Sequence, residues 1–462
     1  MFAKLFSTIA LANLAARASA ELLFQEIASA ANDDQPNCMQ QPFCDRFRSF
    51  MDHPELRAES DVYYSIEKGS SLIHMSDGKF TGQLVLNSAT DGSIAQKLDL
   101  TLSFYKDGIM RMLVEEPDVK RFRISQEDLP VVEEQLISTG IIKSEELYDP
   151  HRLVFSGFSS DEYDESWQYV INMDRFRVEQ YHINGTSSTL TYSLNSEDTL
   201  YYESEAAVSA PRMYSADQQD WDISTLKQQI SEAEGRDVYR EIPESERGSL
   251  WGGVNRGIGL GVFMPSETLF GIGEREDTLV LKRTTGEEPY EMWAFDSPHE
   301  PDRKNGLYGN MPHVQGINDS SSQAITWVNS AHTWVFLDDA SYADQTGSNI
   351  NFVSETGTME LFLYSSSVAS ADGNRNKRIS NKLSTITGYA PLPPLHTLGF
   401  HFSKYDEASA EIIMERNRNF TDYQFPVDVL VMDIQWADYY SEPDGYEYFR
   451  FNPQNFTETD LA

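Results

Sequence analysis

The stretch LDLTLSFYKDG, residues 98–108, decides the class of fold. Apolar residues stand at every second position from Leu98 to Phe104, and this period of two is typical of a strand that buries one face. The pair Asp107-Gly108 follows directly. An Asp-Gly pair between alternating runs indicates a hairpin, because both turn positions need a positive φ. The stretch therefore predicts two antiparallel strands joined by a tight turn.

Similar short runs on both sides of this hairpin predict a sandwich of antiparallel sheets. The candidate strands are RLVFSGF (152–158), WQYVINM (167–173), STLTYSL (188–194), DTLVLKR (277–283), AITWVNS (324–330), TWVFLDD (333–339) and MELFLYS (359–365). Residues 203–248 are polar and acidic with few large apolar side chains, which favours an exposed insert. We therefore expect a mainly β chain with an antiparallel β-sandwich domain over residues 61–387, interrupted by the insert at about 203–248.

The last part of the chain, residues 388–462, follows a different pattern. TLGFHFS (397–403) and VDVLVMDI (427–434) are apolar runs of strand length, and DEASAEIIMERNRNF (406–420) has helical spacing. The order strand, helix, strand predicts a β-α-β unit whose parallel strands are buried on both faces. Such units begin α/β barrels and doubly wound sheets alike.

The N-terminus predicts entry into the secretory pathway. Lys4 precedes an apolar run that ends at Leu14, and an A-x-A cleavage site ends at Ala20. The run is shorter than the ~20 residues of a membrane-spanning helix. No later stretch is long and apolar enough either, so we expect no transmembrane segment. Residues 1–20 are predicted to be a signal peptide, and residues 21–60 a segment that contains both cysteines.

Cys38 and Cys44 are the two cysteines of the chain. In the oxidising compartment that a signal peptide implies, a small local disulfide is favoured over two free thiols. A zinc site needs more ligands than this pair provides. Four N-x-S/T triplets, which are candidate glycosylation sites, fit the same compartment and begin at Asn184, Asn318, Asn419 and Asn455.

The formal charge of −37 narrows the classes of partner. With 73 acidic against 36 basic side chains, binding to the phosphate backbone of nucleic acid is disfavoured, and the excess is explained by solubility. The glycine-rich stretch RGIGLGVF (256–263) does not complete the G-x-G-x-x-G motif of nucleotide-binding folds, and P-loop, G-x-S-x-G and H-E-x-x-H motifs are absent. We therefore expect no nucleic acid partner, no cofactor and no metal.

Asp433 stands at the carboxyl end of the second apolar run of residues 388–462. In α/β folds the loops that follow the strands gather at this edge and bind substrates. A carboxylate there can accept two sugar hydroxyls, and the aromatic side chains of Trp436, Tyr439 and Tyr440 can stack on a pyranose ring. The alternative is an aspartate that only caps a turn, and the spacing leaves both interpretations open.

Two long stretches resemble glycoside hydrolase family 31. LPPLHTLGFHFSKYDEASAEIIMERNRNFTDYQFPVDVLVMDIQWAD (392–438) is similar to the start of its catalytic barrel, where a PP-x-x-x-LG-[FY]-H strand precedes a D-[VI]-x-x-x-DI strand. TLFGIGEREDTLVLKRTTGEEPYEMWAFDSPHEPDRKNGLYGNMPHV (268–314) is similar to the region before that barrel. CMQQPFCDRFRS (38–49) resembles the N-terminus of one branch of the family. Where the family usually has arginine and tryptophan after the first barrel strand, this chain has Lys404 and Tyr405.

This resemblance implies a galactose-mutarotase-like sandwich followed by a (β/α)8 barrel. The branch in question removes α-1,3-linked glucose from N-linked glycans in the endoplasmic reticulum, together with a separate β-type subunit. By position, Asp433 matches the barrel aspartate that holds the hydroxyls of the terminal glucose, and Asp296 matches the aspartate that a sandwich loop sends into the site. Both would bind the α-glucoside without being catalytic. Lysosomal and secreted α-glucosidases of the family remain alternatives.

The same resemblance implies that the catalytic groups lie outside these 462 residues. Retaining glycosidases need a nucleophile and an acid/base, and in this family both lie on later barrel strands, the first in a W-x-DMNE-type motif that is absent here. A complete barrel takes about 250 residues, so we expect only its truncated start over residues 388–462, inactive alone and poorly stable. The alternative is a secreted, non-catalytic carbohydrate-binding or regulatory protein built on the sandwich.

Overall fold

The computed structural model divides the chain into two compact units, Met1–Gly388 (unit 1) and Tyr389–Ala462 (unit 2). The residues that it describes are 37–52, 63–70, 72–74, 78–87, 94–124, 142–143, 151–160, 165–203, 256–295, 304, 306–367, 374–405, 409–438, 447–453 and 455–457. The predicted signal peptide and nearly all of the predicted insert lie outside these residues.

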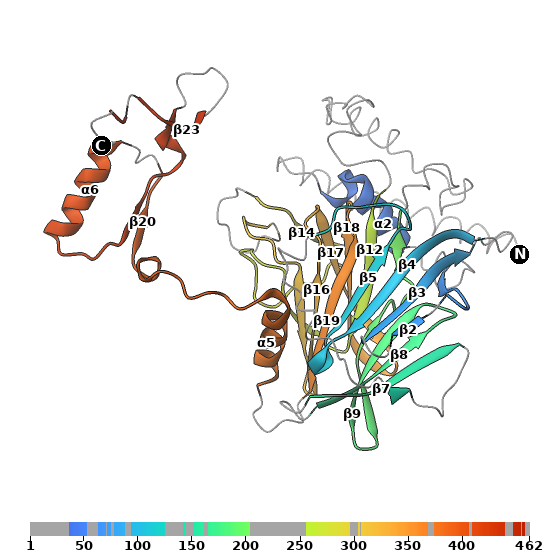
Figure 1. Cartoon of the computed structure of the whole chain (residues 1–462). Coiled ribbons are helices and arrows are strands. Elements are labelled where there is room, and N and C mark those ends of the chain that lie inside the picture. Colours follow the sequence, from blue (N-terminus) through green and yellow to red (C-terminus); the bar gives the residue numbers. More distant parts are fainter. Residues whose placement is uncertain are drawn as a thin grey trace, which may run out of the picture. The chain divides into compact units, whose positions relative to one another are not determined.

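Unit 1 is built on two antiparallel sheets, whose strands run from blue to orange in Figure 1. The first has the order β1 (Tyr64–Ile66), β3 (Lys79–Asn87), β4 (Ile94–Phe104), β5 (Met110–Glu115), β19 (Met359–Ser367), β16 (Ser321–Trp327), β15 (His313–Ile317), β13 (Thr268–Gly271), with β2 (Leu72–His74) beside β3. The second has the order β14 (Tyr290–Met292), β17 (Thr333–Tyr342), β18 (Gln345–Ser354), β12 (Ile258–Met264), β10 (Ser187–Leu194), β9 (Arg177–Asn184), β8 (Glu165–Asn172), β7 (Arg152–Ser160), β6 (Ile142–Lys143), with β11 (Tyr201–Tyr202) beside β12. The predicted mainly β sandwich is confirmed.

The core of unit 1 lies between the two sheets. The alternating apolar residues from Leu98 to Phe104 on β4 are at most 1% exposed, as the period of two predicts. The ring of Phe104 contacts Phe155 of β7 and Tyr169 of β8, with ring centroids 5.6 and 4.8 Å apart. Phe104 lies in the first sheet and the other two rings lie in the second, so the hairpin packs across the interface between the sheets.

The predicted hairpin is present, with β4 paired to β5 and a short 3-10 turn over Lys106–Gly108 between them. Asp107 has a φ of 62° and Gly108 a φ of 72°, so both turn positions have the positive φ that the Asp-Gly pair predicts. Gly108 is also packed closely: a Cβ there would lie 2.5 Å from the ring of Trp167. The glycine therefore serves both backbone conformation and core packing.

Replacing Gly108 by alanine should destabilise unit 1 more than the same change at Gly185, which has a φ of 59° and nothing within 4 Å of an added Cβ. Gly185→Ala costs only the left-handed conformation, about 1–2 kcal/mol. Gly108→Ala adds a clash with Trp167, which brings a further cost of about 1–3 kcal/mol. Urea unfolding of the two variants measures the difference, and equal losses would contradict the packing role.

One predicted strand is wrong. Residues 277–283, DTLVLKR, form no strand, and Leu279 is 81% exposed. The segment is held by side-chain hydrogen bonds instead, since Thr278 Oγ1 donates to the carbonyl of Val280 at 2.7 Å and Lys282 Nζ contacts Asp277 Oδ1 at 2.5 Å. An apolar run alone could not distinguish this arrangement from a strand.

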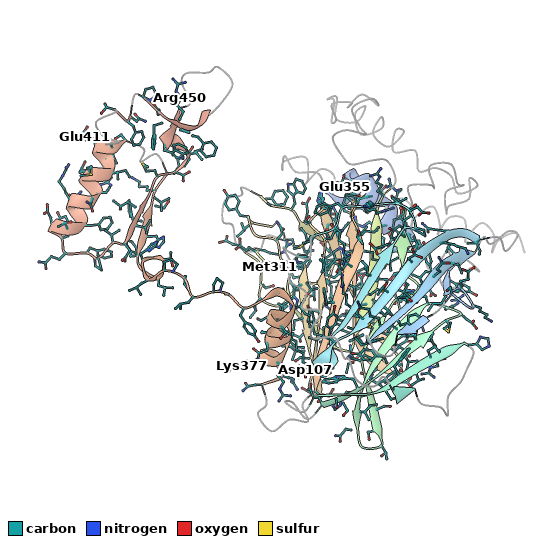
Figure 2. The ribbon with its side chains drawn as sticks, in the orientation of Figure 1. Asp107, Met311, Glu355, Lys377, Glu411 and Arg450 are labelled. Carbon is teal, nitrogen blue, oxygen red and sulfur yellow. A yellow bond between two sulfur atoms is a disulfide. The ribbon has the colours of Figure 1, made fainter. Side chains whose placement is uncertain are left out.

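Helix α5 (Arg375–Thr387) ends unit 1 and is fixed by a buried carboxylate on β8. Glu165 accepts hydrogen bonds from Ser366 Oγ at 2.8 Å and from the Ser367 amide at 2.6 Å, both on β19. It also contacts Arg378 Nη1 and Lys382 Nζ of α5, each at 3.3 Å. Burial lowers the pKa of Lys382, and Glu165 opposes this shift. Figure 2 shows Lys377 on the same helix.

Glu165→Gln should therefore be strongly destabilising, because it removes the carboxylate that two buried cations contact. Breaking a buried ion pair from one side costs about 3–5 kcal/mol. Glu67→Gln is the matched control, since Glu67 pairs with Lys97 at 2.7 Å on the surface, where such pairs contribute about 0–1 kcal/mol. Calorimetric or urea unfolding compares the two, and a Glu165 loss no larger than the Glu67 loss would count against this role.

Unit 2 contains the predicted β-α-β order. β20 (His401–Ser403) and β21 (Val429–Val431) are parallel, with α6 (Ala410–Asp422) between them, and short 3-10 turns η7 (Leu395–Leu398) and η8 (Ile434–Trp436) precede β20 and follow β21. A small antiparallel pair, β22 (Ala437–Asp438) and β23 (Glu447–Phe451), follows. Contrary to the predicted burial on both faces, Phe400 is 43% and Val431 37% exposed. The local order is thus confirmed, while the cover that parallel strands need is not provided by this unit.

A disulfide joins Cys38 and Cys44, as predicted. It closes the start of α2 (Pro42–Asp52) onto the short 3-10 helix η1 (Cys38–Gln40). Among the described residues, no helix is long and apolar enough to cross a membrane.

Candidate functional site

Asp433 lies at the carboxyl edge of the parallel pair in unit 2. The register pairs Ser403 with Val431, so Asp433 and Tyr405 each follow the last paired residue of their strand by two positions. The carboxyl ends of parallel strands share one edge of a sheet. Asp433 therefore belongs to the same edge as Tyr405 and its neighbour Lys404, at which α/β folds bind their ligands.

The carboxylate of Asp433 caps the turn that follows it. Its Oδ1 accepts a hydrogen bond from the amide of Ile434 at 2.7 Å, at the start of η8. Asp433 therefore caps a turn, and this contact does not exclude a role in sugar binding. A carboxylate has about four lone-pair sites, so a cap bond leaves acceptor capacity for sugar hydroxyls. The role of Asp433 in sugar binding stays a prediction.

Trp436 follows on the same turn and is half-buried. Its ring contacts that of Phe451 on β23 edge to face, with centroids 5.4 Å apart, and its carbonyl accepts a hydrogen bond from Asn452. The β22–β23 pair thus supports the ring beside the strand edge. Tyr439 and Tyr440 lie outside the described residues.

Asp296, the second predicted sugar-binding residue, also lies outside the described residues, but both ends of its loop are described. The amide of Phe295 donates to the carbonyl of Leu307 at 3.1 Å, and the amide of Leu307 donates to the carbonyl of Glu274 at 2.9 Å. The amide of Glu274 also donates to the carbonyl of Gly309 at 2.8 Å, and its Oε2 accepts from the Gly309 amide at 2.9 Å. Phe295, Leu307 and Gly309 are therefore linked to one another through Glu274 by short hydrogen bonds.

Arg275 is the residue that joins these segments, and the sequence did not identify it. Its guanidinium donates to the carbonyl oxygens of Ile272 at 2.5 Å and of Glu291 at 2.7 Å, and also to that of Lys304. It lies 5.2 Å from the centroid of the Tyr290 ring. Burial lowers the pKa of Arg275 to about 10, so the guanidinium stays protonated at neutral pH. One cation therefore holds the chain on both sides of the Asp296 loop.

An exposed tryptophan precedes Asp296 by three residues. Trp293 is 49% exposed, and its ring lies 4.8 Å from that of His332. His332 is buried and shares a hydrogen bond of 2.7 Å with Glu291 of β14. Trp293 thus rests on a buried pair, in the segment that leads into the predicted loop.

The four candidate glycosylation sites differ in their surroundings. Asn184 is exposed at the end of β9. Asn318 Oδ1 accepts hydrogen bonds from the amides of Ser320 and Ser321, and its amide group donates to the carbonyl of Pro265. Asn419 lies in α6, and the carbonyl of Asn455 accepts a hydrogen bond from the Ala410 amide. Use of these sites stays a prediction.

Within the parts of the chain that the structure describes, no three His, Cys, Asp or Glu side chains gather in a way that could hold a metal ion. Carboxylates such as that of Asp433 can accept hydrogen bonds, and exposed aromatic rings such as that of Trp293 can stack on a ligand.

Two family profiles match the chain in the order of its two units. Residues 99–335 match the glycosyl hydrolase 31 N-terminal galactose mutarotase-like domain, and residues 390–461 match the glycosyl hydrolases family 31 TIM-barrel domain. The first match alone covers more than half of the 462 residues. The chain belongs to glycoside hydrolase family 31.

Relatives of this family 31 chain include human neutral alpha-glucosidase AB, which is 30% identical over 220 residues, covering 44% of this chain and 22% of the relative. A probable glucan 1,3-alpha-glucosidase from Arabidopsis thaliana is 23% identical over 452 residues, covering 93% of this chain and 43% of the relative. The family 31 chain therefore spans less than half the length of either relative.

Solved structures share the fold of this family 31 chain. The glucosidase II alpha subunit in its alpha3-Glc2-bound form has a TM-score of 0.68 at 20% identity, covering 92% of this chain and 44% of that chain. The ER glucosidase II heterodimeric complex, of the catalytic subunit and the binding domain of the regulatory subunit, contains a chain with a TM-score of 0.68 at 21% identity and the same coverage.

Arg275→Met should open the base of the Asp296 loop, because three carbonyl oxygens lose a charged donor. Hydrogen bonds to charged groups contribute about 1.5–3 kcal/mol each and are not additive, so we expect a loss of about 2–4 kcal/mol. Arg283→Met is the control, since Arg283 donates to one carbonyl, that of Glu267 at 2.8 Å, and pairs with the exposed Asp339; it should therefore lose less than Arg275→Met, which removes the donor of three carbonyls. Urea unfolding measures both, and equal losses would contradict the role of Arg275.

Proposed function

We propose that this chain forms the N-terminal part of an α-glucosidase of the glucosidase II type, which trims α-1,3-linked glucose from N-linked glycans. The observation that carries the proposal is the position of Asp433 at the carboxyl edge of the parallel pair β20–β21, within the stretch that matches the family's TIM-barrel domain. The similarity to neutral alpha-glucosidase AB and the shared fold with the glucosidase II alpha subunit support the same choice.

In this proposal the chain supplies the sugar-binding side of the site. Asp433 and Asp296 accept hydroxyl hydrogen bonds from the terminal glucose, and Trp436 provides an aromatic surface beside it. Bond cleavage by the retaining mechanism needs two carboxyl groups about 5–5.5 Å apart. We assign that pair to the later barrel strands of the complete enzyme, because residues 1–462 contain no W-x-DMNE-type motif.

The proposed partner is a β-type regulatory subunit, and the proposed location is the lumen of the endoplasmic reticulum. A regulatory subunit is bound to the catalytic subunit in the ER glucosidase II complex that shares this fold. The Cys38–Cys44 disulfide supports an oxidising compartment. A lysosomal or secreted α-glucosidase of the family is compatible with the same disulfide.

A non-catalytic carbohydrate-binding protein is the second candidate. It is favoured by one observation: unit 1 has a continuous buried core of its own, with side chains from both sheets. In this second candidate, unit 1 binds sugar without residues 389–462. The two candidates therefore differ in whether sugar binding depends on unit 2.

Binding of the disaccharide Glcα1-3Glc to the 462-residue chain tests this difference. We expect weak binding, with a Kd on the order of millimolar because the chain supplies part of the site, and no hydrolysis. Asp433→Asn should weaken binding about tenfold, since a charged acceptor contributes about 1.5–3 kcal/mol. Titration calorimetry or ligand-observed NMR measures the affinity.

Asp422→Asn, with the same loss of charge at the exposed end of α6, is the control and should bind as the unchanged chain does. Binding that survives both Asp433→Asn and deletion of residues 389–462 would favour the second candidate. Hydrolysis of the disaccharide by the 462 residues alone would overturn the assignment of the catalytic pair to later strands.

A further inference from the structure

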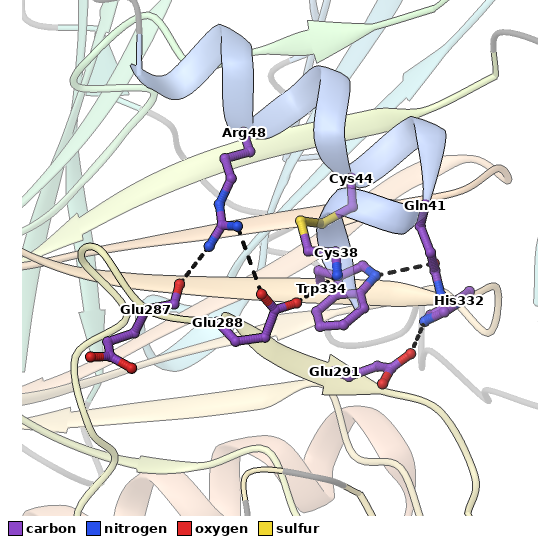
Figure 3. Close-up of a disulfide and its surroundings, with 9 residues drawn as sticks. All are labelled: Cys38, Gln41, Cys44, Arg48, Glu287, Glu288, Glu291, His332 and Trp334. Atoms are coloured by element: carbon purple, nitrogen blue, oxygen red, sulfur yellow. Dashed lines mark hydrogen bonds and ion pairs between the residues drawn. A yellow bond between two sulfur atoms is a disulfide. The ribbon is translucent and has the colours of Figure 1, made fainter. Parts of the chain in front are cut away.

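The N-terminal element of the described chain, residues 38–52, lies on the outer face of the second sheet, as Figure 3 shows. It comprises η1 and α2, closed by the disulfide. Phe47 of α2 is fully buried against Tyr201 and Phe336, with ring centroids 5.6 and 5.7 Å away. The element is therefore packed on the sheet rather than attached only by its ends.

The glycines of RGIGLGVF leave space on the sheet for this element to pack. Gly257, Gly259 and Gly261 alternate along the β12 stretch and so face the same side of the sheet. A Cβ on Gly259 would lie 2.6 Å from the ring of Phe47, and a Cβ on Gly257 would lie 3.2 Å from the carboxylate of Glu203. That carboxylate bonds Arg46 of α2 at 2.6 Å. This glycine pattern, which does not complete the G-x-G-x-x-G motif, thus accommodates a helix.

The same element also contacts Glu287 and Glu288, in the segment before Asp296. Arg48 donates to the carbonyl of Glu287 at 2.5 Å and pairs with the carboxylate of Glu288 at 3.7 Å. The amide of Cys38 donates to Glu288 Oε1 at 2.5 Å. Lys304, on the far side of the loop, donates to the carbonyl of Glu288 at 3.1 Å. Glu288 therefore connects the disulfide to both ends of the loop that carries Asp296.

A second set of contacts leads to Trp293. Trp334 Nε1 donates to Gln41 Oε1 at 3.3 Å, and the ring of Phe43 lies 5.6 Å from that of His332. His332 in turn contacts Glu291 and Trp293. Figure 3 shows Gln41 to the right of the disulfide, and His332 and Glu291 below it.

We propose that the disulfide-closed N-terminal element positions residues 287–295, the segment that leads to Asp296 in the sequence. β14 within this segment has three residues and, among the described strands, pairs with β17 alone. A short edge strand has few ladder hydrogen bonds of its own, so outside contacts decide how firmly it is held. The meaning of this positioning for sugar binding rests on the proposed function, whereas the positioning itself does not.

Hydrogen exchange of the full chain, followed by mass spectrometry, tests the proposal. In Glu288→Ala, amides of residues 290–295 should exchange about tenfold faster, because the contacts with Cys38 and Arg48 are lost. In Glu288→Gln the exchange rate should lie between those of Glu288→Ala and the unchanged chain, since the glutamine oxygen still accepts from the Cys38 amide but does not pair with Arg48. Reduction of the disulfide, or the double change Cys38→Ser and Cys44→Ser, should also accelerate exchange at 290–295.

Glu287→Ala is the matched control, because Arg48 contacts the backbone carbonyl of Glu287 and the exposed side chain points away from it in Figure 3. It should exchange as the unchanged chain does. Peptides from β8 and β9, residues 165–184, report on global stability and should not change in Glu288→Ala. Equal acceleration in Glu287→Ala, equal acceleration at 165–184, or none at 290–295 would each overturn the proposal.

Affinity for Glcα1-3Glc separates the positioning from the proposed function. Glu288→Ala should weaken binding of the disaccharide, and Glu288→Gln should restore part of it. Faster exchange at 290–295 with unchanged affinity would support the positioning and contradict the sugar-binding role of Asp296.

Discussion

The carboxylate of Glu165 is the interaction on which the architecture of unit 1 depends. Glu165 belongs to the second sheet, its two hydrogen-bond donors Ser366 and Ser367 to the first, and its two cationic contacts to α5. A single buried charge thus joins three elements that are far apart in sequence. Buried ion pairs add little net stability, because desolvation offsets the attraction. Their geometry nevertheless restricts how the sheets and the helix can pack, and α5 is the last element before residue 388.

The contacts around the Asp296 loop follow a different principle. Arg275 donates to backbone carbonyls rather than to a carboxylate, and Arg48 also uses one carbonyl besides its ion pair. A carbonyl acceptor fixes the path of the main chain whatever side chain it carries. This explains how an irregular segment, with few ladder hydrogen bonds, can still have a defined course up to Phe295. The two arginines therefore fix the main chain of the segment, in addition to the side-chain contacts that Glu288 and Glu291 make.

The sequence predicted the features that depend on local backbone preference. The period of two around Leu100, the positive φ at Asp107-Gly108 and the helical spacing of α6 all reflect interactions within a few residues. It failed at residues 277–283, where an apolar run is held by side-chain bonds to Asp277 and Tyr290. It also could not identify Arg275, because its acceptors at residues 272, 291 and 304 meet only after folding. Asp433 was identified because a strand end is visible in a sequence, whereas a convergence of carbonyls is not.

The two aspartates of the D-[VI]-x-x-x-DI stretch have different structural positions, which bears on what the motif means. Asp428 precedes β21, and its Oδ2 accepts a hydrogen bond from the amide of Phe400 at 3.1 Å. A Cβ on Gly399 would lie 2.0 Å from that oxygen. Gly399 therefore leaves room for the carboxylate of Asp428. The carboxylate in turn binds the amide of Phe400 and so fixes the start of β20. Asp433, five residues later, is bonded only to its own turn among the hydrogen bonds described for its carboxylate. The first aspartate thus aligns the parallel strands, and this alignment sets the edge at which the second one stands.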